Sequence, residues 1–185
     1  LSAFDDVLQQ LAIDLAQSDE LRLSALLARV RRHPKLDTRS FEFLLSLLDE
    51  DQYPLVRRSA AQTLGLSKPD ERQLVRLVKV AAVAGPLELP ALLPAFENRT
   101  DETLGRLLAK SLGESPGLSA LAASDLQRLF EKFPPSVHSD AKPLIEAMER
   151  ATGAQSQRLI ETLATLPTGN IEQGRRLFFS KKATC

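Results

Sequence analysis

The feature that most limits the fold of this chain is a series of short amphipathic stretches, each of which ends at a proline, a glycine or a polar turn. In the first stretch, the apolar residues Phe4, Val7, Leu8, Leu11 and Leu15 recur mostly at intervals of three or four residues. Such intervals place apolar side chains on one face of an α-helix, whereas a half-buried strand would alternate apolar and polar residues. No stretch of the sequence has that alternation. We therefore predict an all-α fold.

Composition favours the same fold class. Leucine and alanine supply 57 of the 185 residues, and valine and isoleucine only 12. Leucine and alanine lose little side-chain freedom in a helix. The predicted helices cover residues 4–16, 20–31, 38–48, 54–64, 70–83, 101–113 and 124–133, with Gly65 ending the fourth. Pro94 should kink a helix over 87–97, and a long helix over 139–166 could break at Thr152-Gly153.

Two of these helices repeat one another at a fixed distance. Leu21-Arg22-Leu23-Ser24-Ala25 lies 35 residues before Val56-Arg57-Arg58-Ser59-Ala60, and residues 101–113 are a weaker echo. Helix pairs that recur every 30 to 50 residues or so are typical of α-solenoids, in which each pair buries its apolar face on its neighbours. The pattern predicts a HEAT-like helical repeat array over residues 1–166. The alternative is a single irregular bundle in which the similarity arises by chance.

Charge and residue inventory argue against several functions. Lys plus Arg and Asp plus Glu both number 24, which is not the balance of a general nucleic-acid binder. No apolar run is long enough to span a membrane. One cysteine, Cys185, cannot form an internal disulfide, and His33 and His138 have no other metal ligand at the usual spacing. Because no catalytic motif is recognisable either, we expect no enzyme activity, no metal and no cofactor in these residues.

Two charged clusters have a functional and a structural interpretation. The basic group Arg29, Arg31, Arg32 and Lys35 beside His33 could bind an acidic partner, but cations also suit the end of a helix. The acidic run 49–51 lacks the spacing of a calcium loop and is better explained as a turn with a helix N-cap. For both clusters we favour the structural interpretation.

Residues 167–185 differ from the repeats and form a linker followed by a short amphipathic helix. Ile171, Gly174, Leu177 and Phe178 lie on one side of that helix, and the segment carries four basic residues against Glu172. Glycine at position 174 permits a close helix crossing, and Leu177 and Phe178 supply an apolar contact. From these residues alone the segment is a docking helix or a frayed terminus.

The tail resembles the opening of a class I c-type cytochrome domain. The matching residues are Gly169-Asn170, Gly174-Arg175, Leu177-Phe178 and Cys185. In that family the motif continues as C-x-x-C-H, which attaches haem through two thioethers and ligates iron through histidine. The resemblance implies that Cys185 is the first thioether cysteine and that Gly174, Leu177 and Phe178 pack the first helix of the cytochrome domain. The chain stops at that cysteine, so these residues should hold no haem c alone.

Repeats followed by this tail resemble the haem-binding multidomain cytochromes of planctomycetes and verrucomicrobia. Residues 84–93, 115–118 and 132–135 also resemble that family. The resemblance implies an exported, periplasmic protein in which this segment is a non-catalytic scaffold between a sugar or alcohol dehydrogenase module and a haem c domain. Its partners would be other domains of the same chain or another protein, and both ends would be boundaries within a longer protein.

Two other functions stay open on sequence grounds. One is a protein-binding α-solenoid without a redox role, and the other is a stand-alone helical enzyme domain. The residues that follow Cys185 would test the cytochrome prediction, because any continuation other than x-x-C-H rejects it.

Overall fold

The computed structural model describes residues 2–166 and 169–180, and in these residues helices are joined by turns and loops, without a strand. The all-α prediction is therefore confirmed. The elements are α1 (Ser2–Ile13), α2 (Asp19–Val30), α3 (Thr38–Ser46), α4 (Pro54–Leu66), α5 (Glu71–Val83), α6 (Leu89–Leu92), η1 (Leu93–Phe96), α7 (Glu102–Glu114), η2 (Pro116–Ala120), α8 (Ala123–Phe130), α9 (Pro135–Thr165) and α10 (Ile171–Phe178). The chain divides into two units, Leu1–Met148 and Glu149–Cys185, and Cys185 lies outside the described residues.

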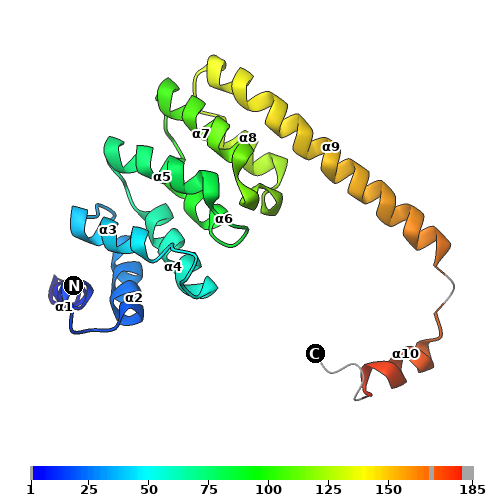
Figure 1. The fold of residues 1–185 in the computed structure, drawn as a ribbon, viewed down its shortest axis with the longest axis horizontal. Coiled ribbons are helices and arrows are strands. Elements are labelled where there is room, and N and C mark those ends of the chain that lie inside the picture. The colour runs from blue at the N-terminus through cyan, green and yellow to red at the C-terminus, as the bar shows by residue number, and fades with distance from the viewer. Residues whose placement is uncertain (1, 167–168, 181–185) are drawn as a thin grey trace. The chain divides into compact units, whose positions relative to one another are not determined.

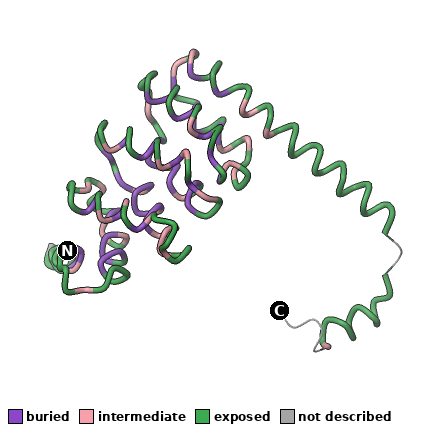
Figure 2. The backbone as a smooth tube through the Cα atoms, viewed as in Figure 1, coloured by how far each residue is buried: buried purple, intermediate pink, exposed green. Residues whose placement is uncertain are grey.

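Helices of the first unit are arranged in successive layers (Figure 1). The even-numbered helices pack on one another, α2 on α4 and α4 on α6, and α5 packs on α7. Buried residues concentrate where these helices face each other (Figure 2). The largest fully buried side chains include Phe41, Phe96 and Phe130, which lie in α3, η1 and α8. One continuous apolar core therefore runs through the first unit.

Four polar contacts between layers share a separation of 34 residues in the sequence. The amide of Lys68 donates to the carbonyl oxygen of Pro34 at 2.7 Å. Arg76 pairs with Glu42, Lys132 donates to Asn98, and the Ser136 hydroxyl donates to Glu102, each across 34 residues. We call this series the 34-residue ladder. Between α4 or α5 and the layer that follows, the corresponding ties span 30 or 31 residues: the Arg99 side chain donates to the Pro69 carbonyl oxygen and the Ser115 hydroxyl to that of Ala84.

The starts of the odd-numbered helices also recur. Asp37, Asp70 and Asp101 are the N-caps of α3, α5 and α7, and each accepts a hydrogen bond from the amide three residues on. An aspartate at this position satisfies a backbone donor that the helix leaves without an intrahelical partner. The same chemistry therefore begins three successive layers.

The structure corrects two details of the predicted helices, at Gly65 and at Thr152-Gly153, and agrees with the interruption predicted at Pro94. Gly65 lies inside α4, not at its end, and is buried. The segment over 87–97 forms α6 and the 3₁₀ helix η1, because Pro94 lacks the amide that an α-helix would use there. Helix α9 continues through Thr152-Gly153 without a break.

The predicted inward face of the first helix is only partly correct. Leu8 is buried, whereas Phe4, Val7 and Leu15 are more than half exposed. Leu15 lies beyond the end of α1 at Ile13. The periodicity identified the helix, but it did not indicate how narrow a face of α1 is covered by α2, on which it mainly packs.

Candidate functional site

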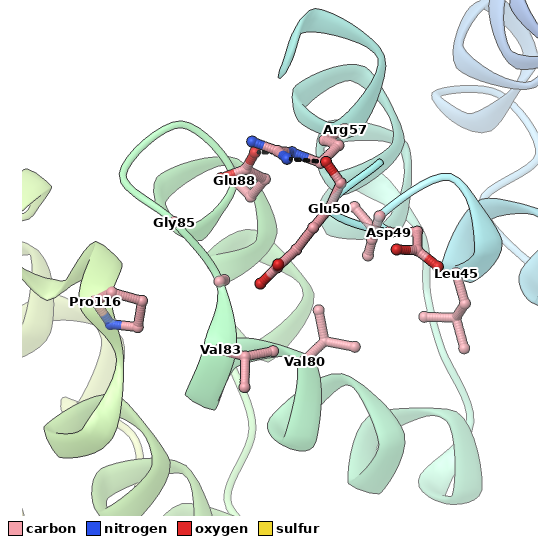
Figure 3. A pocket seen from close by; sticks show the side chains of 11 residues that line it. Leu45, Asp49, Glu50, Arg57, Val80, Val83, Gly85, Glu88 and Pro116 are labelled. Carbon is pink, nitrogen blue, oxygen red and sulfur yellow. Dashed lines mark hydrogen bonds and ion pairs between the residues drawn. The ribbon is translucent and has the colours of Figure 1, made fainter. Parts of the chain in front are cut away.

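A groove of about 670 Å³ lies in the first unit between the turn that joins α3 to α4, the C-terminal end of α5 and the loop that leads to α6 (Figure 3). Its apolar lining is Leu45, Leu48, Val80, Val83, Ala84 and Pro116. Gly85 and the charged residues Asp49, Glu50, Arg57 and Glu88 complete it. We call it the acidic groove, because three carboxylates and one guanidinium give it a formal charge of about −2 at neutral pH.

An ion pair fixes two sides of the acidic groove. The Nε atom of Arg57 donates to Oε1 of Glu88 at 2.9 Å, and the Glu88 side chain is only 9% exposed. The Nη1 atom of Arg57 donates to the backbone carbonyl oxygen of Glu50 at 3.0 Å. One guanidinium on α4 thus holds both the α3–α4 turn and the loop before α6. Removing one member of such a mostly buried pair would leave an uncompensated charge.

Gly85 leaves the space that the Glu88 carboxylate occupies. A Cβ atom at position 85 would lie 2.6 Å from Oε2 of Glu88, which is closer than real Cβ atoms approach. The carboxylate would have to move if residue 85 carried a side chain. The shape of this wall therefore depends on a glycine.

The C-terminal end of α5 places the apolar wall. Leu74, Leu77, Val78 and Ala81 face the core, which leaves Val80 and Val83 on the side of the groove. The carbonyl oxygen of Ala84 accepts hydrogen bonds from the Gly117 amide at 2.9 Å and the Ser115 hydroxyl at 3.0 Å. These bonds hold the end of α5 against η2, which carries Pro116. Val83 stays 75% exposed although it is apolar.

The side chains of Asp49 and Glu50 differ from that of Glu88, which pairs with Arg57. Both are exposed, and among the described residues neither carboxylate has an ion-pair partner. Figure 3 shows the Glu50 side chain extending from the turn toward Val80 and Gly85, while that of Asp49 points toward Leu45. The groove therefore presents negative charge beside aliphatic surface.

The predicted residues of the tail lie in the second unit. Asn170 caps α10 by accepting a hydrogen bond from the Gln173 amide at 3.0 Å. Leu177 and Phe178 are exposed, at 60% and 74%, and no described atom lies within 4 Å of a Cβ built on Gly174. Cys185 is outside the described residues. The predicted packing of Gly174, Leu177 and Phe178 against a cytochrome domain stays a prediction.

The basic cluster at the end of α2 is partly used within the chain. Arg32 donates to Oδ1 of Asp5 from Nε at 2.9 Å and from Nη2 at 2.7 Å, and Nε2 of His33 lies 3.1 Å from Oδ2. The hydrogen bonds from Arg32, and then the one from His33, lower the pKa of the Asp5 carboxyl below its ordinary value. This cluster ties the end of α2 to α1.

Both histidines have a hydrogen-bond partner within the chain. Nε2 of His138 lies 2.8 Å from the Phe130 carbonyl oxygen, and His33 is held by Asp5. In the part of the chain that the structure describes, no group of three His, Cys, Asp or Glu side chains is placed to hold a metal ion. Covalent attachment of haem c uses two cysteines and an axial histidine, and Cys185, which the resemblance assigns to that motif, lies outside the described residues. Haem attachment therefore stays a prediction.

Sequence reasoning missed the acidic groove. The run 49–51 was interpreted as a turn with an N-cap; the turn is correct, but Tyr53 precedes α4 at the cap position. A usable signal was Glu88, which is the single charged residue between Lys79 and Glu97. A lone charge in an apolar stretch is seldom buried unless it is paired.

Comparison of the chain with protein-family models, with curated proteins and with solved structures gave no match. Among the helices described, none is both long and apolar enough to cross a membrane.

Proposed function

We propose that residues 1–148 are a HEAT-like α-solenoid that serves as a non-catalytic scaffold and holds other protein domains in place. The 34-residue ladder is the observation that carries this proposal. Contacts that repeat at separations of 30 to 34 residues, together with aspartate caps on α3, α5 and α7, are what a stack of similar helix pairs produces. Such stacks offer long surfaces to partners, and their geometry is set by the same small step at each repeat.

The second part of the proposal concerns the tail. By resemblance, residues from Gly169 onward open a class I cytochrome c domain, and Cys185 is its first thioether cysteine. The exposed apolar face of α10, with Ile171, Leu177 and Phe178 at 60% exposure or more, supports this, because the first helix of a domain would be covered by the rest of it. The scaffold would then hold a haem c domain and a sugar or alcohol dehydrogenase module in an exported, periplasmic protein.

The test compares the 185-residue chain with the same chain continued by the codons that follow Cys185, both expressed in a periplasm that has a cytochrome c maturation system. We expect the continuation to read x-x-C-H, the longer protein to bind haem covalently and the 185-residue chain to be colourless. Cys185→Ala in the longer protein should remove the thioether at that position and shift the pyridine haemochrome band. A different continuation, or a Soret band in the 185-residue chain, rejects the cytochrome assignment.

A substitution at Gly174 tests whether α10 packs against a cytochrome domain, and the 185-residue chain serves as the control. Gly174→Val should leave the thermal midpoint of the 185-residue chain unchanged, because no described atom lies near the site. In the longer protein the same substitution should lower the midpoint of haem-domain unfolding, because a close helix crossing has no room for the larger side chain. Equal effects in both proteins would contradict the assigned role of Gly174.

The alternative function is a protein-binding solenoid with no redox role. The acidic groove favours this alternative, because the groove is formed by residues of the first unit and needs no residue of the tail. Pulldown of exported proteins tests this alternative, with charge reversal at the exposed Arg58 as the probe. Arg57 is unsuitable, because its loss would also release the Glu88 carboxylate.

A further inference from the structure

We infer that the acidic groove binds a basic segment of a partner protein, with one Lys or Arg side chain lying along Val80 and Val83 and reaching the Glu50 carboxylate. This inference rests on the proposed function, in which the chain binds other proteins, and it names the chemistry of the partner. Three features of the groove carry it: its fixed walls, its charge and its aliphatic lining.

The walls are formed before any partner binds. Arg57 ties the α3–α4 turn and the loop before α6 to one guanidinium, and the Ala84 carbonyl oxygen is held by Ser115 and Gly117. A groove whose sides are already fixed costs little ordering on binding, and this favours a specific contact.

The charge selects a cation. Glu88 is neutralised by Arg57, so Asp49 and Glu50 carry the remaining negative charge. A partner that brings a positive group gains Coulomb attraction on approach and a charge-assisted hydrogen bond at contact. The three carboxylates are not grouped as ligands of one metal ion among the described residues, so the complementary charge is better supplied by a side chain.

The lining selects a cation with an aliphatic stem. Lys and Arg bury their methylene stems on apolar surface while the charged head stays at a polar site. Val80 and Val83 supply such a surface next to Glu50, and Val83 is largely exposed in the free chain. Flanking aliphatic residues of the partner would contact Leu45, Leu48 and Pro116.

The experiment measures binding of a short fluorescein-labelled peptide, in which lysine and leucine alternate, to the 185-residue chain by fluorescence anisotropy. Glu50→Gln should weaken binding about tenfold, because one charge-assisted hydrogen bond to a carboxylate is lost. Val83→Ser should weaken it about threefold or more through lost apolar contact. Asp51→Asn is the matched control, because Asp51 lies in the same turn but does not line the groove, and it should leave the affinity unchanged.

Two further ligands show which features of the lysine–leucine peptide the groove recognises. A peptide with norleucine in place of lysine keeps the stem and lacks the charge, and it should bind about tenfold more weakly. Spermidine should compete poorly, since it lacks the flanking aliphatic side chains. Equal losses for Glu50→Gln and Asp51→Asn, no measurable binding of the lysine–leucine peptide, or displacement by spermidine at the concentration of the peptide itself would each overturn the inference.

These outcomes are separable from those of the proposed function. Haem attachment in the longer protein without peptide binding removes only the groove inference. Peptide binding that depends on Glu50 without haem attachment removes the cytochrome assignment and leaves the protein-binding alternative. Each variant is compared at an unchanged thermal midpoint, which is expected because Glu50, Asp51 and Val83 are exposed.

Discussion

Glycines in the first unit mark the closest approaches between segments. A Cβ atom on Gly65 would collide with the backbone carbonyl of Ala91, and one on Gly117 would lie 2.5 Å from the carbonyl oxygen of Gly85. Neither glycine has a positive φ, so the reason for glycine is space and not backbone conformation. Close approach of α4 to the segment that contains α6 therefore depends on a missing side chain.

Gly65→Ala is expected to destabilise the protein by about 1–3 kcal/mol, because the obstructing atoms belong to the backbone and cannot rotate away. Gly113→Ala is the matched control: it lies in the exposed last turn of α7 with no atom near its Cβ position, and it should stabilise by about 0.5–1 kcal/mol. Urea unfolding of the two variants measures both effects. A stabilising Gly65→Ala would mean that α4 and the Ala91 backbone are not in close contact.

Gly65 shows that one glycine in a sequence can be interpreted in two ways. A glycine after an apolar run predicts a helix end, and the same residue equally suits a tight helix crossing. Which of the two applies depends on the segment around Ala91, 26 residues away in the chain. The sequence therefore located the helix over 54–64 but misplaced its end.

At the scale of elements, one carboxylate connects the first two helices. Asp5 on α1 accepts hydrogen bonds from Arg32 and lies against His33, just beyond the end of α2. The pKa of Asp5 is lowered, chiefly by Arg32, so the folded state prefers the charged carboxylate. The stabilisation from this contact is therefore complete above the ordinary pKa of aspartate and disappears as the pH falls through the lowered pKa.

Asp5→Asn should lower the thermal midpoint at pH 7, and the difference from the parent protein should shrink as the pH falls through the lowered pKa of the Asp5 carboxyl. Added salt should shrink the difference at pH 7, since the pair is solvent-accessible. Asp6→Asn, at the neighbouring position, is the control. Thermal scans by circular dichroism across this pH range provide the measurement, and a difference that persists at low pH would contradict the ion pair as the cause.

Periodicity predicted which segments are helical better than it predicted what covers them. Leu74, Leu77, Val78 and Ala81 are buried as the spacing indicated, because α5 lies between neighbouring layers. Phe4 and Val7 have the same spacing and are exposed, because α1 packs mainly on α2. The number of neighbours is a property of the stack and cannot be read from one helix.

On the scale of the whole molecule, all the buried residues in the part of the chain that the structure describes belong to the first unit. Residues 149–166 and 169–179 are exposed throughout. The last buried residue of the described chain is Ala141, and the first unit ends at Met148. Met148 lies 34 residues after Glu114, where α7 ends. The first half of α9 therefore occupies the register of one more odd-numbered helix.

A chain shortened to residues 1–148 should keep the thermal midpoint of the 185-residue chain to within about 2–4 °C, because no buried side chain is removed. Differential scanning calorimetry of both chains measures this. As a comparison, ending the chain before α9 should lower the midpoint strongly, since it removes the buried Val137 and Ala141. A large loss on removing 149–185 alone would contradict the division into these two units.

The sequence predicted the helix of the tail, but it did not predict the acidic groove. The amphipathic helix of the tail was predicted from its local pattern, whereas Asn170 was assigned to a linker and proves to be the N-cap of that helix. The acidic groove was not, because Glu50, Val83 and Glu88 come from three segments that only the stacking of layers brings together. Glu88 indicated a buried charge, but its partner Arg57 lies 31 residues earlier in the chain.

The 34-residue ladder has a consequence for the order in which the protein forms during synthesis. Each layer needs only the residues about 34 positions earlier to complete its contacts, so the loop that must close is of similar length at every step. The entropy of loop closure then does not grow as the chain lengthens. Layers can be added one at a time from the N-terminus as the ribosome releases them, and folding need not wait for the end of translation.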